Sequence, residues 1–119
     1  MSMKPVHFLG NSRTVLRKFP AEVKERIGYA LYEAQKGEKA ANTKPLKGFH
    51  GASVLEVIED DDGATYRAVY TIRFSNAVYV LHTFQKKSKK GIATPKQDIA
   101  LIKSRLKLAE EDWKKETTS

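Results

Sequence analysis

The sequence predicts an α+β fold, in which helices lie before and after a small antiparallel sheet. Apolar residues near both ends of the chain recur at helical spacing, whereas residues 53–85 are rich in the β-branched and aromatic residues of strands. Short turns, one of them carrying Asp62-Gly63, separate the middle strands, and strands joined in this way form an antiparallel meander. The expected order, β-α-α-β-β-β-α, differs from the repeating β-α-β order of a parallel sheet.

The N-terminal part predicts one short strand followed by a helical hairpin. The stretch PVHFL, residues 5–9, has the composition of a strand, and Asn11 or Ser12 can cap a short first helix. Pro20 suits the first turn of a second helix, because its missing N–H has no helical partner there. Gly37 is expected to end that helix. Its apolar face is formed by Val23, Ile27, Ala30, Leu31 and Ala34.

Three strands are predicted next, for residues 53–59, 65–73 and 77–85. Strict alternation places Arg67 and Arg73 on the same face of the second strand. In the third strand, a regular alternation places His82 on the face of Val78 and Val80, together with Phe84 and Lys86.

A long amphipathic helix is predicted to close the chain. Thr94 is a good N-cap residue, and Pro95 then occupies the first helical position. The apolar face of this helix consists of Ile99, Ile102, Leu106, Ala109 and Trp113. We expect this face to pack on the sheet, although its heptad-like spacing also suits a partner helix.

Length and charge predict a single domain, residues 1–119, that attracts polyanions. The net charge is +8 and the pI about 9.7, and the charge is unevenly distributed. Acids concentrate in EDDDG (59–63) and EED (110–112), whereas residues 86–107 contain eight basic residues and the single acid Asp98. Clustering beside a strand end favours a nucleic-acid contact, but lysine-rich surfaces can also serve solubility alone.

Several kinds of site are not supported by the sequence. Cysteine is absent, and the three histidines show no metal-ligand spacing, so we expect neither a metal nor a cofactor. No Gly-rich nucleotide motif and no G-x-S-x-G motif occurs. No apolar run approaches the roughly 20 residues of a membrane span, and a cytoplasmic protein is expected.

Two groups of cations leave alternatives open. Arg67, in the middle of a strand, either forms an ion pair with Glu56 or lines a phosphate groove together with Arg73. The lysines after the last strand attract RNA whatever its sequence. One of them can also act as a base, because neighbouring ammonium groups disfavour each other's charge, while a second one stabilises a phosphate in the transition state.

Taken in order, six stretches resemble the phage-related, HigB-like branch of the RelE/ParE toxin superfamily across residues 6–109. They are FPAEVKERIGYALYEAQKGEKA, KPLKGF, VLEV, YRAVYTIRF, VYVLHTFQKKSKKGIATP and DIALIKSRLKLA. The resemblance implies a RelE-like α+β fold and the toxin half of a type II toxin–antitoxin pair, with a helix-turn-helix antitoxin as partner. It also implies metal-independent cleavage of mRNA, usually on the ribosome, by attack of the RNA 2′-hydroxyl to leave a 2′,3′-cyclic phosphate.

The resemblance and the charge pattern together predict a set of catalytic residues and a set of RNA-binding residues. The expected catalytic residues are Arg67, Arg73, Lys86, Lys87 and His82. The expected RNA-binding residues are Lys44, Lys47, Lys89 and Lys90. RelE itself uses a tyrosine near its C-terminus, whereas the last tyrosine here is Tyr79, so Lys87 or His82 is the expected base or acid. A histidine inside a strand is, however, more often a packed core residue.

Two other functions fit the same sequence. A ParE-like toxin shares the fold but inhibits DNA gyrase, and it needs no catalytic residues. A non-catalytic RNA- or DNA-binding module would use the lysines only to hold phosphates. The dense basic group after the last strand favours the ribonuclease over the gyrase inhibitor, because a gyrase-binding toxin has no scissile phosphate to stabilise. The sequence leaves the non-catalytic binding module open.

Overall fold

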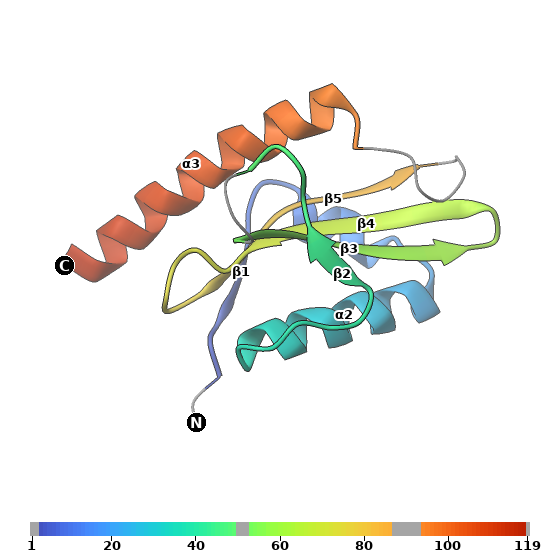
Figure 1. Ribbon diagram of the computed structural model, residues 1–119, viewed down its shortest axis with the longest axis horizontal. Coiled ribbons are helices and arrows are strands. Elements are labelled where there is room, and N and C mark those ends of the chain that lie inside the picture. The colour runs from blue at the N-terminus through green and yellow to red at the C-terminus, as the bar shows by residue number, and fades with distance from the viewer. Residues whose placement is uncertain (1–2, 50–52, 87–93, 119) are drawn as a thin grey trace.

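A computed structural model describes residues 3–49, 53–86 and 94–118, and it confirms the α+β fold (Figure 1). The three long strands form the predicted meander, with helices before and after it. The elements are β1 (Val6–Phe8), α1 (Ser12–Arg17), α2 (Ala21–Gln35), β2 (Thr43–Pro45), β3 (Val54–Asp61), β4 (Ala64–Thr71), β5 (Val78–Lys86) and α3 (Lys96–Thr118).

The sheet is mixed, which corrects the prediction of a purely antiparallel one. Its strand order is β1-β5-β4-β3-β2, and β1 pairs with β5 in parallel, Val6 opposite Val78. The other three pairings are antiparallel. The short strand β2 was not predicted, because three residues that include a lysine and a proline carry little strand signal.

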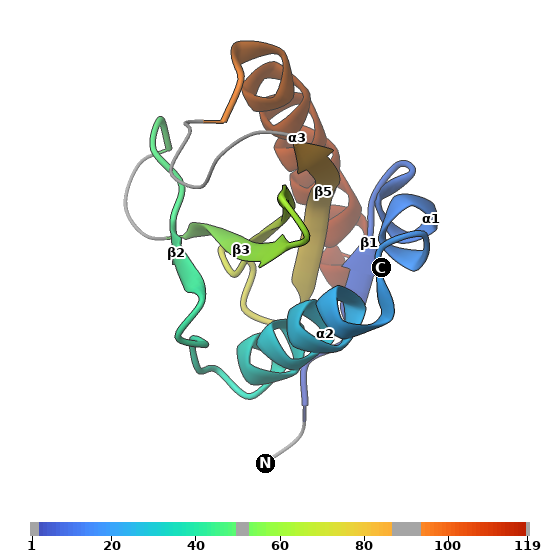
Figure 2. The ribbon, with the colours of Figure 1, turned by 90° about the vertical axis from the view of Figure 1, so that its right-hand side faces the viewer.

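Each face of the sheet packs against a different helix (Figure 2). On one face, Val23, Ile27 and Ala30 of α2 pack with residues of β3, β4 and β5. On the other face, Ile102 and Ala109 of α3 pack with a second set of strand residues. We call these the α2 face and the α3 face. The predicted apolar sides of both helices are therefore core, and in α3 this favours packing on the sheet over a partner-helix seam.

Two predicted turns have the expected backbone. Asp62 and Gly63, with φ of 48° and 80°, form the tight turn between β3 and β4. Gly37 follows α2 with φ of 87°, and its N–H donates to the Ala34 carbonyl, as a glycine at a helix C-terminus does.

None of the helices in the described ranges combines the length and hydropathy that crossing a bilayer requires.

Candidate active site

A β-bulge in β5 decides which side chains meet on the α3 face. Tyr70 of β4 is aligned with Val80, but its neighbour Val69 is aligned with His82, so Leu81 has no partner in the register. The extra residue reverses the alternation of every position after it. His82 therefore lies on the α3 face, and the prediction that it shares a face with Val80 is wrong.

The sheet register places four of the nine predicted site residues, Lys44, Arg67, His82 and Lys86, on that same face. Residues aligned across antiparallel strands point to the same side and form rows. The rows are Lys44, Glu56, Val69 and His82; Ile58, Arg67 and Phe84; and Asp60, Thr65 and Lys86. With strands about 4.8 Å apart, Lys44 and His82 are separated by about 14 Å, a span that fits a few nucleotides of RNA.

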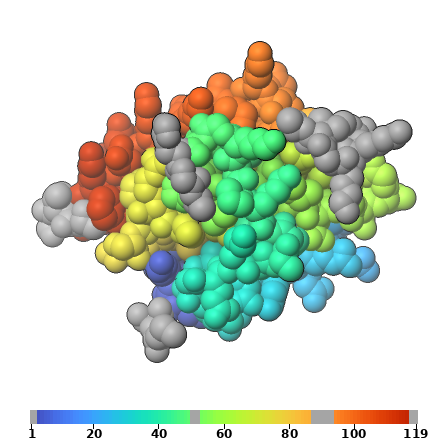
Figure 3. Space-filling model, in the orientation of Figure 1, coloured from blue at the N-terminus to red at the C-terminus, as the bar shows by residue number. Residues whose placement is uncertain are grey.

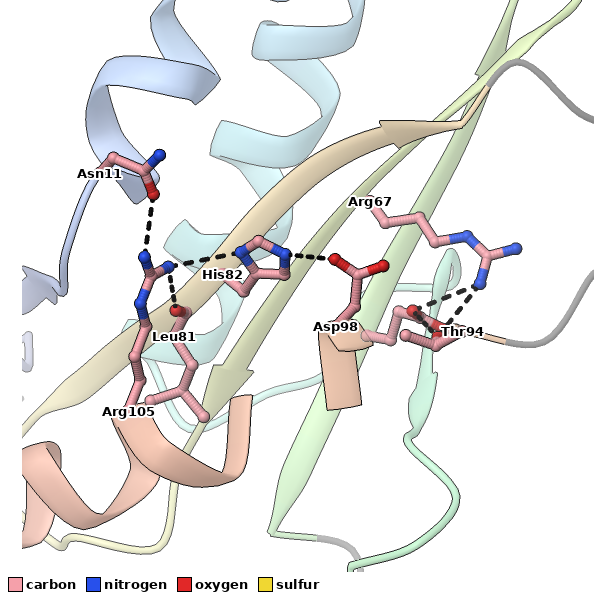
Figure 4. A network of polar contacts seen from close by, with 8 residues as sticks. Asn11, Arg67, Leu81, His82, Thr94, Asp98 and Arg105 are labelled. Carbon is pink, nitrogen blue, oxygen red and sulfur yellow. Dashed lines mark hydrogen bonds and ion pairs between the residues drawn. The ribbon is translucent and has the colours of Figure 1, made fainter. Parts of the chain in front are cut away.

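Arg67 is buried and paired. Its Nη1 donates to Glu56 Oε2 at 3.4 Å, and only 3% and 2% of the two side chains are exposed. Thr94, just before α3, bridges the pair: its hydroxyl donates to Glu56 at 2.8 Å and accepts from Arg67 at 3.3 Å (Figure 4). Of the two alternatives for Arg67, the ion pair is the one present. The Thr94 hydroxyl is therefore engaged here and does not act as the predicted helix cap. At the start of α3, the Ile99 N–H donates to the Pro95 carbonyl.

His82 is held from both sides by α3. Its Nε2 lies 2.8 Å from Asp98 Oδ1, and its Nδ1 lies 3.3 Å from Arg105 Nη1 (Figure 4). Burial lowers the pKa of Arg105, but a guanidinium remains protonated in proteins and can only donate. The imidazole must therefore accept at Nδ1 and donate from Nε2 to Asp98. With both nitrogens engaged and 7% of the residue exposed, His82 in this arrangement fastens β5 to α3.

The same guanidinium ties α3 to the chain before α1. Arg105 also donates to the Leu81 carbonyl at 2.9 Å and to Asn11 Oδ1 at 3.0 Å. Asn11 stands at the N-cap position of α1 but makes no side-chain cap there, because its side chain faces Arg105. We call Asn11, His82, Asp98 and Arg105 the α3 clamp.

Gly10 makes room for the α3 clamp. Its φ is +56°, and a Cβ built on it would lie 2.5 to 2.8 Å from three atoms of the Arg105 guanidinium group. A side chain at this position would therefore have to push Arg105 out of its hydrogen bonds.

We expect Gly10→Ala to lower the free energy of unfolding by about 2–3 kcal/mol, since it adds backbone strain and breaks the α3 clamp. Gly37→Ala is the matched control, because its φ is also positive but its Cβ would meet nothing within 4 Å. It should cost only about 1 kcal/mol. Urea denaturation measures both. If the two variants lose the same free energy of unfolding, a clash with Arg105 is not the cause. The same follows if Gly10→Ala is just as destabilising when Arg105 is already replaced by alanine.

The predicted lysines are only partly described. Lys86 is half-buried at the end of β5, two residues beyond Phe84 and on the face of Arg67. Lys44 and Lys47 are exposed, in β2 and in the turn after it. Lys87, Lys89 and Lys90 lie outside the described residues.

Arg73 does not join the other cations. It lies two residues beyond the end of β4, up to about 20 Å from Arg67 along the chain. Its Nη2 donates to Ser53 Oγ at 3.4 Å. The structure therefore does not bring the two arginines together in one groove.

Four residues of these networks were not predicted as functional: Asn11, Thr94, Asp98 and Arg105. Asp98 had a signal, since it is the single acid among eight basic residues. The others were interpreted as caps or as part of the basic surface, because their partners come from distant segments.

Within the described ranges, no three His, Cys, Asp or Glu side chains group as a metal site requires.

Comparisons with known proteins agree with this architecture. Residues 14–107 match the sequence profile of the family described as "Phage derived protein Gp49-like". No curated protein matches the sequence.

Solved structures show the same fold at low identity. The isolated E. coli RelE toxin, in its P21 form, is 18% identical with a TM-score of 0.54, covering 85% of this chain and 97% of that one. A double arginine-to-alanine mutant of E. coli toxin RelE in the free state is 20% identical with a TM-score of 0.52, covering 69% and 82%. The expectation of a RelE-like fold is confirmed.

Proposed function

Since this chain belongs to the family of phage-derived Gp49-like proteins and has the RelE fold, we propose that it is the toxin of a type II toxin–antitoxin pair. We propose further that it acts as an endoribonuclease on mRNA, on the ribosome and in the cytoplasm, with a helix-turn-helix antitoxin as its partner. Its place in the HigB-like branch stays a prediction.

The observation that carries the proposal is the gathering of cations on the α3 face. Lys44 and His82 stand in one row of this surface, Arg67 in the next row and Lys86 in the third. A net charge of +8 attracts RNA over a long range, and ammonium groups at defined strand positions can hold its phosphates.

The proposed reaction needs no atom from outside the RNA. The 2′-oxygen attacks the adjacent phosphorus and loses its proton to a base, forming a new P–O bond. The bond to the 5′-oxygen of the next nucleotide breaks, and that oxygen takes up a proton. The products are a 2′,3′-cyclic phosphate and a 5′-hydroxyl. In this proposal Lys86 neutralises the crowded phosphate, and Lys87 is the candidate base.

A non-catalytic RNA-binding module is the second candidate, and a specific observation favours it. Arg67 and His82, two of the five expected catalytic residues, are both buried and hydrogen-bonded to protein groups. They are not presented to a substrate in this arrangement. A ParE-like inhibitor of gyrase would likewise leave both residues in structural roles.

Mapping mRNA 5′ ends after induced expression tests the proposal. We expect growth arrest together with new 5′ ends inside translated codons, each carrying a hydroxyl. Intact mRNA with gyrase-linked DNA breaks would establish the ParE-like alternative instead. If mRNA and DNA both stay intact and the purified protein still binds RNA, the result supports the non-catalytic binding module.

A further inference from the structure

A groove on the α2 face has a character opposite to that of the cationic α3 face. It has a volume of about 650 Å³, within the range of natural ligand sites. Its lining residues come from the start of α2, the connection to β2 and the end of β3: Glu22, Glu25, Arg26, Tyr29, Ala40, Ala41, Asn42 and Glu59. In Figure 3, the start of α2 (light blue) lies next to the β3–β4 hairpin (yellow-green). We call this the α2 groove.

The α2 groove is acidic on a basic protein. Three carboxylates line it against the single guanidinium of Arg26, which already pairs with Glu59 at 3.3 Å. Glu59 also accepts from Asn42 Nδ2 at 2.6 Å. Glu22 and Glu25 are exposed and form no ion pair with any described residue. The chain has 22 basic residues and 14 acids, so carboxylates without an ion pair stand out on it. The two beside this groove can form ion pairs with a cation of another molecule.

The groove also offers an apolar surface. Tyr29 is 58% exposed, the largest value among the described large hydrophobic residues. The neighbouring Glu33 carboxylate raises the pKa of Tyr29, chiefly through hydrogen bonding, so the hydroxyl is neutral at physiological pH. Ala40 and Ala41 line the same groove with small side chains. An aromatic ring beside carboxylates suits a cation on an apolar stem, through cation–π attraction and burial of methylene groups.

From these features we propose that the α2 groove binds a segment of a partner protein that carries a lysine or arginine flanked by apolar side chains. RNA does not fit this groove, because its phosphates would face Glu22 and Glu25. The segment would lie on the sheet face opposite Lys44 and Lys86, so binding it leaves the cationic α3 face open. If the proposed function holds, the antitoxin is the first natural protein to test, and only that identification rests on the proposed function.

A selection from displayed random peptides tests the groove without using RNA cleavage or toxicity. The full chain is immobilised, and enriched peptides are synthesised and measured by fluorescence polarisation. We expect enrichment of Lys or Arg beside Leu, Phe or Trp. Tyr29→Ala and Glu25→Gln should each weaken the binding of an enriched peptide about tenfold, and added salt should weaken it further.

Matched controls exist on the same protein. Leu108 is 53% exposed on α3 and does not line the groove, and Glu111 is exposed on the same helix. Leu108→Ala and Glu111→Gln should leave peptide affinity within about twofold. The proposal is overturned if the enriched peptides lack a cation, or if the control variants lose as much affinity as the groove variants. It is also overturned if Tyr29→Ala abolishes a self-association of the chain, because the occupant is then a second copy. Because none of these measurements uses RNA cleavage, their outcomes can be interpreted even if the chain proves not to be a ribonuclease.

Discussion

Arg67→Ala should lower the free energy of unfolding by roughly 3–5 kcal/mol, a large part of the stability of a small domain. The Arg67 side chain is 3% exposed, and its guanidinium pairs with Glu56, whose side chain is 2% exposed. Removing it leaves a buried carboxylate that still accepts from the Thr94 hydroxyl but has lost its cation. An uncompensated buried charge costs far more than an exposed ion pair contributes. Urea denaturation followed by circular dichroism measures the loss.

Two further variants separate this cause from a general intolerance of substitution. Arg73→Ala removes an exposed arginine from the segment just after the same strand, and it should change stability by less than about 0.5 kcal/mol. Replacing both partners, with Glu56→Leu and Arg67→Met together, should recover most of the loss, because no buried charge remains. A double variant as unstable as Arg67→Ala would show that packing, and not the charge, is what Arg67 supplies.

This stability effect changes how an activity test at Arg67 is interpreted. Loss of mRNA cleavage in Arg67→Ala would follow from unfolding as readily as from a lost phosphate contact. The folded fraction must therefore be measured in the same preparation. Lys86 is the better residue for a test of catalysis, because it is half-buried at the end of its strand and far less enclosed.

The parts of the fold that depend on local pattern were predictable from the sequence. The apolar stripe of α2, the Asp62–Gly63 turn and the alternation in β4 each arise from neighbouring residues. Strand β2 and the parallel pairing of β1 were not predictable in this way. Val6 meets Val78 across seventy-two positions of the chain, and three-residue strands have too few positions to show a period.

The candidate site was less predictable, because a single irregularity determines it. The sequence LHTF gives no sign that Leu81 is the extra residue of a bulge, yet that residue moves His82 to the α3 face. Arg105 then reaches His82 from a helix whose charged residues look like an ordinary solvated surface. The Glu56–Arg67 ion pair was one of the two alternatives that the sequence left open, and it could be expected because adjacent strands of a meander place diagonal neighbours within reach.

Lys86→Ala should lower the rate of mRNA cleavage about 10²–10³-fold, the loss expected when one charge-stabilising group is removed from a transition state. Lys86 extends β5 on the face of Arg67 and is aligned with Thr65, so the strand fixes its position better than a loop would. The stability change should stay under about 1 kcal/mol. Cleavage of a reporter mRNA in a translating extract gives the rate. Lys24→Ala, an exposed lysine on α2, is the control and should cleave at the parental rate.

Lys86→Arg then separates the two roles that a lysine can have here. An arginine keeps the charge but cannot take up a proton, so near-parental cleavage would assign Lys86 to phosphate stabilisation. A loss as deep as in Lys86→Ala would assign it to proton transfer. If neither variant changes cleavage, Lys86 is outside the reaction. In a module that only binds RNA, no cleavage exists to be lost, and Lys86→Ala instead reduces the salt dependence of binding by about one counterion.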